Sequence, residues 1–201
     1  MDALVVVVNQ RNPLTSIDPR QLDALFSVTR LCGANQVPER WGDLGLHQAE
    51  WQQRSIQRYG RNSASSTWGF FKQQALCQGD FRNDVAEFPG SAAVVQAVAG
   101  DPRSIGYASF GFHLSGVKLL PVITKRGEAV APDPESIRSG RYPWARPLYL
   151  YVNKVPGKPL PPLLAAFLEQ VLSSAGQQRV IEAGYLPLSE TQMNLARASL
   201  R

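Results

Sequence analysis

The sequence is poor in the residues that most often carry catalysis or bind metals. Among 201 residues it has two histidines, His47 and His113, and two cysteines, Cys32 and Cys77. Neither cysteine lies in a Cys-x-x-Cys pair or at a metal-like spacing from a histidine. We therefore expect no metal, no cofactor and no catalytic residue, and we do not predict an enzyme.

Charge is also scarce, and it is dispersed. Charged residues make up 18% of the chain, below the usual quarter, and the net charge is +5 with a pI near 9.5. No run of five or more Lys and Arg residues occurs, so a nucleic-acid partner is not expected. A mild basic excess suits small anions.

Long apolar runs are missing as well. The longest early run, Ala3–Val8, covers six residues, whereas a membrane-spanning helix needs about 20. The N-terminus has neither the basic region nor the small-residue cleavage site of a signal peptide. We predict no membrane span, and the chain as written carries no export signal.

The two cysteines leave two interpretations open. Cys32 and Cys77 can form a disulfide if the protein resides in an oxidising compartment. They can equally be two buried free thiols.

Apolar runs and turn residues predict strands that alternate with helices, which is typical of an α/β fold with a mixed sheet. The predicted strands are Leu4–Val8, Ser55–Tyr59, Ser104–Phe110, Val117–Ile123 and Leu148–Val152. Helices are predicted from Pro19, over Thr67–Cys77, from Gly90 to Ala99, within Pro132–Ser139, over about 161–174 and 175–183, and after Ser189. Asp80, Asp84 and Glu87 are interpreted as a solvated helix end.

The segment "RNSASST", Arg61–Thr67, joins a predicted strand to a predicted helix through small, hydroxyl-rich residues. The first N–H groups of a helix lack partners within the helix and attract anions. An arginine fork adds two donors that match two oxygens of a tetrahedral oxyanion. The alternative is an ordinary polar loop with an N-cap serine, and the P-loop pattern is absent.

A serine nucleophile would need a neighbouring base. His47 and His113 are the only histidines, and neither has the sequence context of a catalytic triad. Each is better explained by a surface or packing role.

Arg61-x-x-x-Ser65-Ser66-Thr67 resembles the Arg-x-x-x-Ser-Gly-Thr loop of the phosphate-binding proteins that serve phosphate ABC transporters. The resemblance extends over nearly the whole chain and keeps the order of the family's segments. These segments are "NPLTSIDPRQLDALFS", "WGDLG", "PGSAAVVQAVAGDPRSIGYASFGF", "RYPWARPLYLYVNK" and "FLEQVLSSAGQQRVIEAGYLPL". The fold implied is the two-lobed periplasmic-binding-protein type II architecture.

The resemblance implies that Arg61, Ser65, Ser66 and Thr67 bind inorganic phosphate or a similar oxyanion. It also implies an ABC transporter permease as partner and a periplasmic or extracellular location. Ser66 stands where the family usually has glycine. A serine there would be strained if that position needed a positive φ, and harmless if it begins the helix.

Compared with the family, the chain matches one complete lobe, residues 10–145, and part of a second lobe, residues 1–9 and 146–201. The family's N-terminal half-lobe, with its own donors and an acidic acceptor, has no counterpart. We therefore expect weakened phosphate binding, and a homodimer or a complementing half-lobe joined through residues 160–200. The alternatives are a non-transport structural or regulatory module that kept the fold and, less favoured, a phosphatase-like enzyme.

Overall fold

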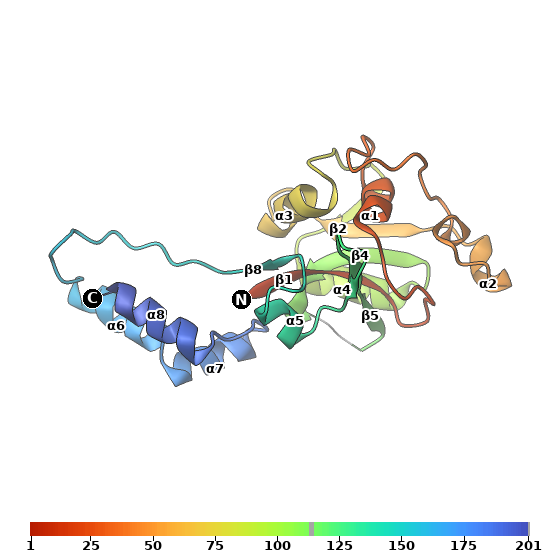
Figure 1. Ribbon diagram of the computed structural model, residues 1–201. Helices are drawn as coiled ribbons and strands as arrows, with labels where there is room; N and C mark the ends of the chain where they lie inside the picture. Colours follow the sequence, from red (N-terminus) through yellow and green to blue (C-terminus); the bar gives the residue numbers. More distant parts are fainter. Residues whose placement is uncertain (113–114, 201) are drawn as a thin grey trace. The chain divides into compact units, whose positions relative to one another are not determined.

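The structure is a computed structural model that describes residues 1–112 and 115–200, so the histidine at position 113 lies outside the described residues. The chain divides into two compact units. One unit comprises Ala3–Ala145, and the other comprises Met1–Asp2 together with Arg146–Arg201. Figure 1 traces the elements along the chain.

The larger unit is built around one mixed sheet, and this confirms the predicted fold class. Its strands follow the order β3-β2-β4-β1-β5, and a short strand, β8, also pairs with β1. β2 runs parallel to both β3 and β4, whereas β1 runs antiparallel to β4 and β5. The strands are β1 (Asp2–Asn9), β2 (Gln57–Arg61), β3 (Val85–Phe88), β4 (Ser104–Ser109), β5 (Val117–Leu120) and β8 (Ala145–Arg146).

β1 is buried along all eight of its residues, as the unbroken apolar run Ala3–Val8 within it predicts. It pairs with β4 through Leu4–Val8 on one side and with β5 on the other. Ala3–Asn9 therefore belongs with the larger unit, whereas the sequence-based division began that lobe at residue 10. A central strand cannot be separated from the sheet that it holds together.

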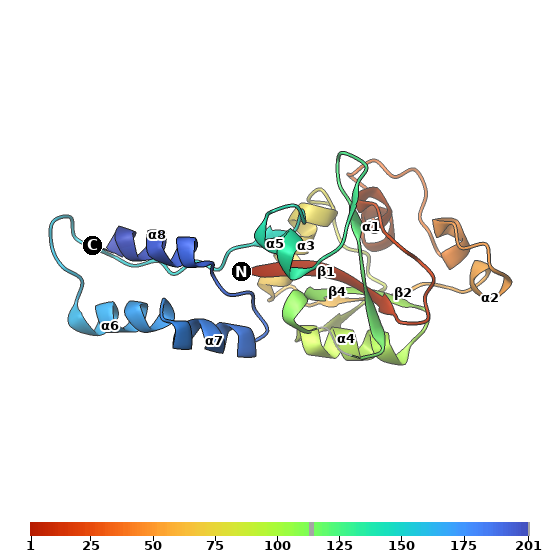
Figure 2. The ribbon, with the colours of Figure 1, turned by 60° about the horizontal axis from the view of Figure 1, so that its bottom comes forward.

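Helices cover both faces of the sheet (Figure 2). α1 (Pro19–Phe26) and α3 (Ser66–Ala75) lie on one face, and α4 (Ser91–Gly100) lies on the other. The alternation of side chains along β4 accounts for this, because successive residues of a strand point to opposite faces. Gly106 faces Val94 and Val98 of α4, while Tyr107 stacks on Phe71 with ring centroids 3.8 Å apart.

The predicted start of α1 is confirmed in detail. Asp18 caps the helix by accepting a hydrogen bond from the backbone N–H of Arg20 at 2.7 Å, and Pro19 occupies the first helical position. Gln21 completes a capping box by accepting from the backbone N–H of Asp18 at 3.0 Å. Such caps satisfy donors that the helix cannot satisfy itself.

The predicted strand Val117–Ile123 is two strands. β5 ends at Leu120, and β6 (Val122–Ile123) pairs instead with β7 (Ala129–Val130). Pro121 separates them because it has no N–H to donate to a sheet. The remaining short elements of this unit are η1 (Trp41–Leu44), α2 (Ala49–Gln52), η2 (Phe110–Phe112) and α5 (Pro134–Arg138).

The interpretation of Asp80, Asp84 and Glu87 as a solvated helix end is wrong. Residues 85–88 form strand β3, which is parallel to β2. Asp84 pairs with two arginines, at 2.7 Å from Nη2 of Arg82 and 3.2 Å from Nη1 of Arg58. The hydrogen bond from Arg82 holds the pKa of the Asp84 carboxyl below its usual value.

The smaller unit contains three helices, α6 (Pro162–Val171), α7 (Ser174–Glu182) and α8 (Glu190–Leu200). The helix predicted after Ser189 is α8, and a capping box precedes it. Gln192 accepts from the N–H of Ser189 at 2.9 Å, and Ser189 Oγ accepts from the N–H of Gln192 at 3.2 Å.

The predicted strand Leu148–Val152 is wrong, because the structure has no strand there. Its composition favours a strand, yet a strand forms only where a neighbour supplies hydrogen-bond partners. The side chains from Leu148 to Tyr151 are exposed, and that of Tyr151 is 90% exposed.

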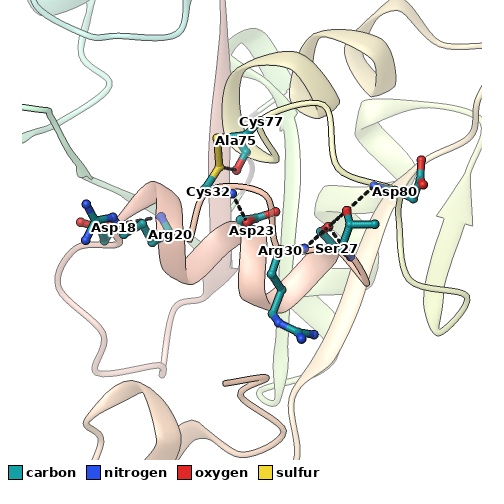
Figure 3. Close-up of a disulfide and its surroundings, with 10 residues drawn as sticks. Asp18, Arg20, Asp23, Ser27, Arg30, Cys32, Ala75, Cys77 and Asp80 are labelled. Atoms are coloured by element: carbon teal, nitrogen blue, oxygen red, sulfur yellow. Dashed lines mark hydrogen bonds between the residues drawn. A yellow bond between two sulfur atoms is a disulfide. The ribbon is translucent and has the colours of Figure 1, made fainter. Parts of the chain in front are cut away.

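Cys32 and Cys77 form a disulfide, which decides between the two interpretations of the cysteines (Figure 3). Their Cα atoms lie 5.4 Å apart, and the bond ties the loop after α1 to the end of α3. The N–H of Cys32 also donates to Oδ2 of Asp23 at 2.7 Å. Burial raises the pKa of Asp23, although this hydrogen bond opposes the increase.

The aromatic stack beside β2 is tightly packed around a glycine. A Cβ atom added to Gly60 would lie 2.8 Å from Cε1 of Tyr107. Tyr107 also donates a hydrogen bond from its hydroxyl to the carbonyl oxygen of Arg61 at 3.3 Å. Burial raises the pKa of Tyr107 far above its ordinary value, so this hydroxyl stays protonated and able to donate.

We expect Gly60→Ala to lower the free energy of unfolding by about 1–3 kcal/mol, because the methyl group must displace the Tyr107 ring. Gly69→Ala is the matched control. Gly69 lies inside α3 with nothing within 4 Å of an added Cβ, so alanine should raise stability by about 0.5–1 kcal/mol. Urea unfolding of both variants tests the pair, and equal effects would contradict this account of the stack.

Removing the disulfide with Cys32→Ser and Cys77→Ser together should lower the free energy of unfolding. The bond closes a sequence separation of 45 residues, and chain entropy for a loop of that size predicts a loss of about 4 kcal/mol. Denaturant unfolding of the double variant measures the loss. The wild-type chain under a thiol reductant is the control and should show the same midpoint as the variant.

Candidate anion-binding site

The candidate site lies where three parallel strands end. β2 ends at Arg61, β3 ends opposite it at Phe88, and β4 ends at Ser109. Helices α3 and α4 begin just after β2 and β3. In open α/β sheets ligands bind at this edge, because helix N-termini and loops converge there.

Arg61 is held at this edge by two neutral acceptors. Its Nη1 donates to Oγ of Ser91 at 3.1 Å, and its Nη2 donates to the carbonyl oxygen of Pro89 at 2.9 Å. Its Nε is enclosed and has no acceptor among the residues that the structure describes. No carboxylate within the described ranges forms an ion pair with this guanidinium.

Arg58, three residues earlier on the same strand, shows the contrasting arrangement. Its side chain is 3% exposed and lies 3.2 Å from Glu39 and 3.2 Å from Asp84. Two carboxylates therefore balance its charge, as a buried ion requires. The charge of Arg61 has no such balance, which makes its surroundings favourable to an anion.

The N-terminus of α3 contributes backbone donors. Ser65 caps the helix, and its Oγ accepts from the N–H of Thr67 at 3.1 Å. Its carbonyl oxygen accepts from the N–H groups of Trp68 and Gly69. The N–H of Ser66 has no acceptor in the described part of the chain. A helix N-terminus also carries a partial positive charge.

Ser66 is the first residue of α3. The non-glycine residues with positive φ among those described are Arg30, Cys77 and Gln78. Serine is therefore accommodated without left-handed strain where the resembling family has glycine. The side chain is exposed, whereas the neighbouring Thr67 is 4% exposed.

The structure thus places all four predicted ligand residues on one strand end and one helix start. Arg61 ends β2, Ser65 is the cap, and Ser66 and Thr67 open α3. Their role as ligands stays a prediction. The N–H of Thr67 is already engaged by the cap, so Arg61 and the N–H of Ser66 are the donors best placed to be free.

Ser91 was not predicted from the sequence as part of the site. This residue is 3% exposed, and its Oγ accepts both from Arg61 and from the N–H of Ser109 at 3.2 Å. It therefore links β2, β4 and the start of α4. The signal in the sequence was the Gly90-Ser91 pair after a second strand, but β3 was not predicted, so the pair could not be placed beside Arg61.

The described residues contain neither a metal-binding cluster nor a membrane-spanning helix. Within residues 1–112 and 115–200, no group of three or more His, Cys, Asp or Glu side chains is arranged to hold a metal ion. Among the same residues, no helix is long and apolar enough to span a membrane. A cavity of 160 Å³ is lined by α1 residues and by the loop 34–44, including Arg20 and Asp43, but by none of the predicted ligands.

Comparisons with curated proteins find relatives over most of the chain. The chain is 49% identical over 189 residues to a protein named phosphate-binding protein PstS from Pseudomonas aeruginosa. The matched region covers 94% of this chain and 58% of that protein. The chain is 28% identical to protein SphX of Synechococcus elongatus, over 93% of this chain and 54% of that protein. The chain thus spans a little over half the length of these relatives.

Solved structures share the fold. A possible phosphate-binding protein from Planctomyces limnophilus superposes with a TM-score of 0.71 at 21% identity, over 99% of this chain and 69% of that one. A putative phosphate ABC transporter substrate-binding protein with bound phosphate, from Clostridium perfringens, gives the same score and identity over 94% and 69%. At this identity the likeness shows the fold alone.

A family model described as the PBP superfamily domain matches residues 1–175. This match covers most of the chain, and it agrees with the mixed sheet and with the fold of the solved relatives. The chain belongs to the PBP superfamily.

Proposed function

We propose that this chain binds inorganic phosphate or a similar oxyanion and serves as a solute-binding protein in phosphate uptake. The observation that carries the proposal is the guanidinium of Arg61, which has no carboxylate partner among the described residues. It is held by Pro89 and Ser91 at the start of α4, at the sheet edge where α3 also begins. The names of the relatives, phosphate-binding protein PstS among them, give independent support.

Each predicted ligand has a distinct role in this proposal. Arg61 supplies the positive charge and the N–H groups of its two terminal nitrogens that are not used by Ser91 and Pro89. Ser66 supplies a backbone N–H, and the hydroxyls of Ser65, Ser66 and Thr67 supply further donors. The dipole of α3 adds positive potential. Neutralisation by these groups makes a metal unnecessary.

This set consists of an arginine, backbone N–H groups and hydroxyls, and it contains no carboxylate. A tetrahedral dianion accepts hydrogen bonds through all its oxygens, whereas a protonated phosphate also needs an acceptor for its own proton. We therefore propose that this chain distinguishes poorly between phosphate and sulfate.

We also propose that affinity is modest for this chain by itself. The predicted donors all lie in the larger unit, on the end of one strand and the start of one helix. High affinity for a small anion depends on enclosure that excludes water. A second copy or a complementing half-lobe would supply the opposing donors.

The disulfide supports an exported protein. Disulfides persist in oxidising compartments and are rare in the cytosol, and the larger unit contains one between Cys32 and Cys77. We propose a periplasmic or extracellular location and an ABC transporter permease as partner.

Two alternative functions, a structural or regulatory module and a phosphatase-like enzyme, can be distinguished from phosphate binding. A structural or regulatory module that kept the fold is favoured by the one-sided arrangement of the donors, and such a module would not bind phosphate measurably. A phosphatase-like enzyme is less favoured, because Ser65 Oγ is used as a helix cap and His47 is exposed on a loop.

Isothermal titration with inorganic phosphate tests the proposed function. We expect binding by the wild-type chain, competition by sulfate, and a loss of about 100-fold or more in affinity for Arg61→Ala, since a charge-assisted pair is removed. Arg126→Ala is the matched control, because Arg126 is exposed on the turn between β6 and β7. Absence of phosphate binding by the wild-type chain would favour the non-transport module. Equal phosphate affinities of Arg61→Ala and the wild type would show that Arg61 is not part of the binding site.

Association through residues 160–200 is the second part of the proposal. The apolar side chains of this segment are only partly exposed, because Leu168 and Leu172 are 5% and 7% exposed within the smaller unit. Leu163 and Phe167 on α6 are 85% and 53% exposed. Apolar side chains clustered on one helix favour a protein partner.

Light scattering after size exclusion tests this association. We expect wild-type chains to dimerise at high concentration and the double variant Leu163→Glu, Phe167→Glu to remain monomeric, because two charges would be buried without partners. Leu31→Glu is the control, since Leu31 is 60% exposed on the larger unit. A monomeric wild type over the whole concentration range would contradict the homodimer.

A further inference from the structure

We propose that Ser91 is the positioning residue of the anion site, and that it orients Arg61 without neutralising it. The inference rests on the proposed function and assigns a role to a residue outside the predicted ligand set. Ser91 Oγ and the carbonyl oxygen of Pro89 accept one hydrogen bond each from the two terminal nitrogens of Arg61, at 3.1 and 2.9 Å.

Neutral acceptors and carboxylates have different effects on an arginine. Both fix the direction of the guanidinium, but a carboxylate also cancels its charge toward a third group. Arg58 and Arg82 form ion pairs with Glu39 and Asp84, and these carboxylates neutralise their charges within the fold. Arg61 is fixed by a hydroxyl and a carbonyl, so its orientation is set while its charge remains available.

Ser91 is itself held in place. It is 3% exposed, it is the first residue of α4, and its Oγ also accepts from the backbone N–H of Ser109 at the end of β4. A hydroxyl oxygen has two lone pairs, and both are occupied here. The position of Ser91 is thus set by the sheet and the helix rather than by the arginine.

The two terminal nitrogens of the guanidinium therefore both donate to residues at the start of α4. One N–H on each terminal nitrogen remains without an acceptor among the described residues, whereas the Nε–H is enclosed. A fixed arginine binds with less loss of side-chain entropy than a mobile one. Ser91 therefore raises affinity by preorganisation and by the absence of a counter-charge.

An isosteric pair of variants separates charge from shape. Ser91→Asn and Ser91→Asp introduce the same volume and an acceptor oxygen, but only the aspartate introduces a negative charge. An acidic residue in the first turn of a helix is favourable, so the aspartate should not weaken α4. We expect Ser91→Asp to bind sulfate roughly 100-fold more weakly than Ser91→Asn. The reason is that a carboxylate at hydrogen-bond distance from the Arg61 guanidinium would cancel its positive charge toward the anion.

A second pair tests orientation. Ser91→Ala should weaken sulfate binding by about 10-fold through loss of one charge-assisted hydrogen bond, while Ser91→Thr keeps the hydroxyl and should retain most of the affinity. Ser104→Ala is the matched control. Ser104 is also fully buried, and its Oγ bonds to backbone carbonyls at the other end of α4.

Titration calorimetry with sulfate and with inorganic phosphate measures all five variants, and thermal melting confirms that each is folded. Binding by Ser91→Asn should also weaken with added salt more steeply than binding by Ser91→Asp, which a merely structural role would not produce. Equal affinities of the aspartate and asparagine variants, or wild-type affinity in a folded Ser91→Ala, would overturn the inference while leaving the proposed function intact. A wild-type chain that binds neither anion would instead overturn the proposed function.

Discussion

The parallel pairing of β2 with β3 and β4 is the constraint on which the candidate site depends. It brings three strand ends to one edge of the sheet, and the helices that follow β2 and β3 must then begin at that edge. The pairing sets Arg61 opposite Phe88, so the turn that follows β3 can reach the guanidinium with Pro89 and Ser91. Without this register the arginine would end a strand with no neighbour to orient it.

The two arginines of β2 show how one strand can serve stability and binding. Arg61 lies three positions after Arg58, an odd offset, so their side chains leave opposite faces of the sheet. Arg58 meets Glu39 and Asp84, which makes it part of the fold. Arg61 meets only neutral oxygens among the described residues. The difference lies in the partners, and those partners come from segments distant in the sequence.

Local signals made much of this arrangement predictable. The burial of β1 follows from its own unbroken apolar run, and the caps at Asp18 and Ser189 follow from residues three positions apart. The loop from Arg61 to Thr67 could be placed between a strand and a helix for the same reason. Each of these features is decided by a short stretch of chain.

Features that depend on distant partners were not predictable in this way. The segment Leu148–Val152 has the composition of a strand but no neighbour to pair with in the structure. Asp84 was interpreted as solvated, yet it pairs with its neighbour Arg82 and with Arg58, which is 26 positions earlier. Ser91 could not be recognised because its proposed role depends on a hydrogen bond from Arg61, which is 30 positions earlier. Sequence patterns report local conformation, and they carry little information about tertiary contacts.

The surroundings of the candidate site are held by contacts on both faces of the sheet at β2. On one face Tyr107 stacks on Phe71 of α3 and donates to the carbonyl oxygen of Arg61. On the other face Ser91 holds the guanidinium. The far end of α3 is tied to the loop after α1 by the disulfide at Cys77. A small anion offers few contacts with which to offset the ordering of its ligands, so ligands already ordered by the fold are an advantage. Rigidity of this kind, combined with an arginine whose charge is not cancelled, is what an anion site requires from one lobe.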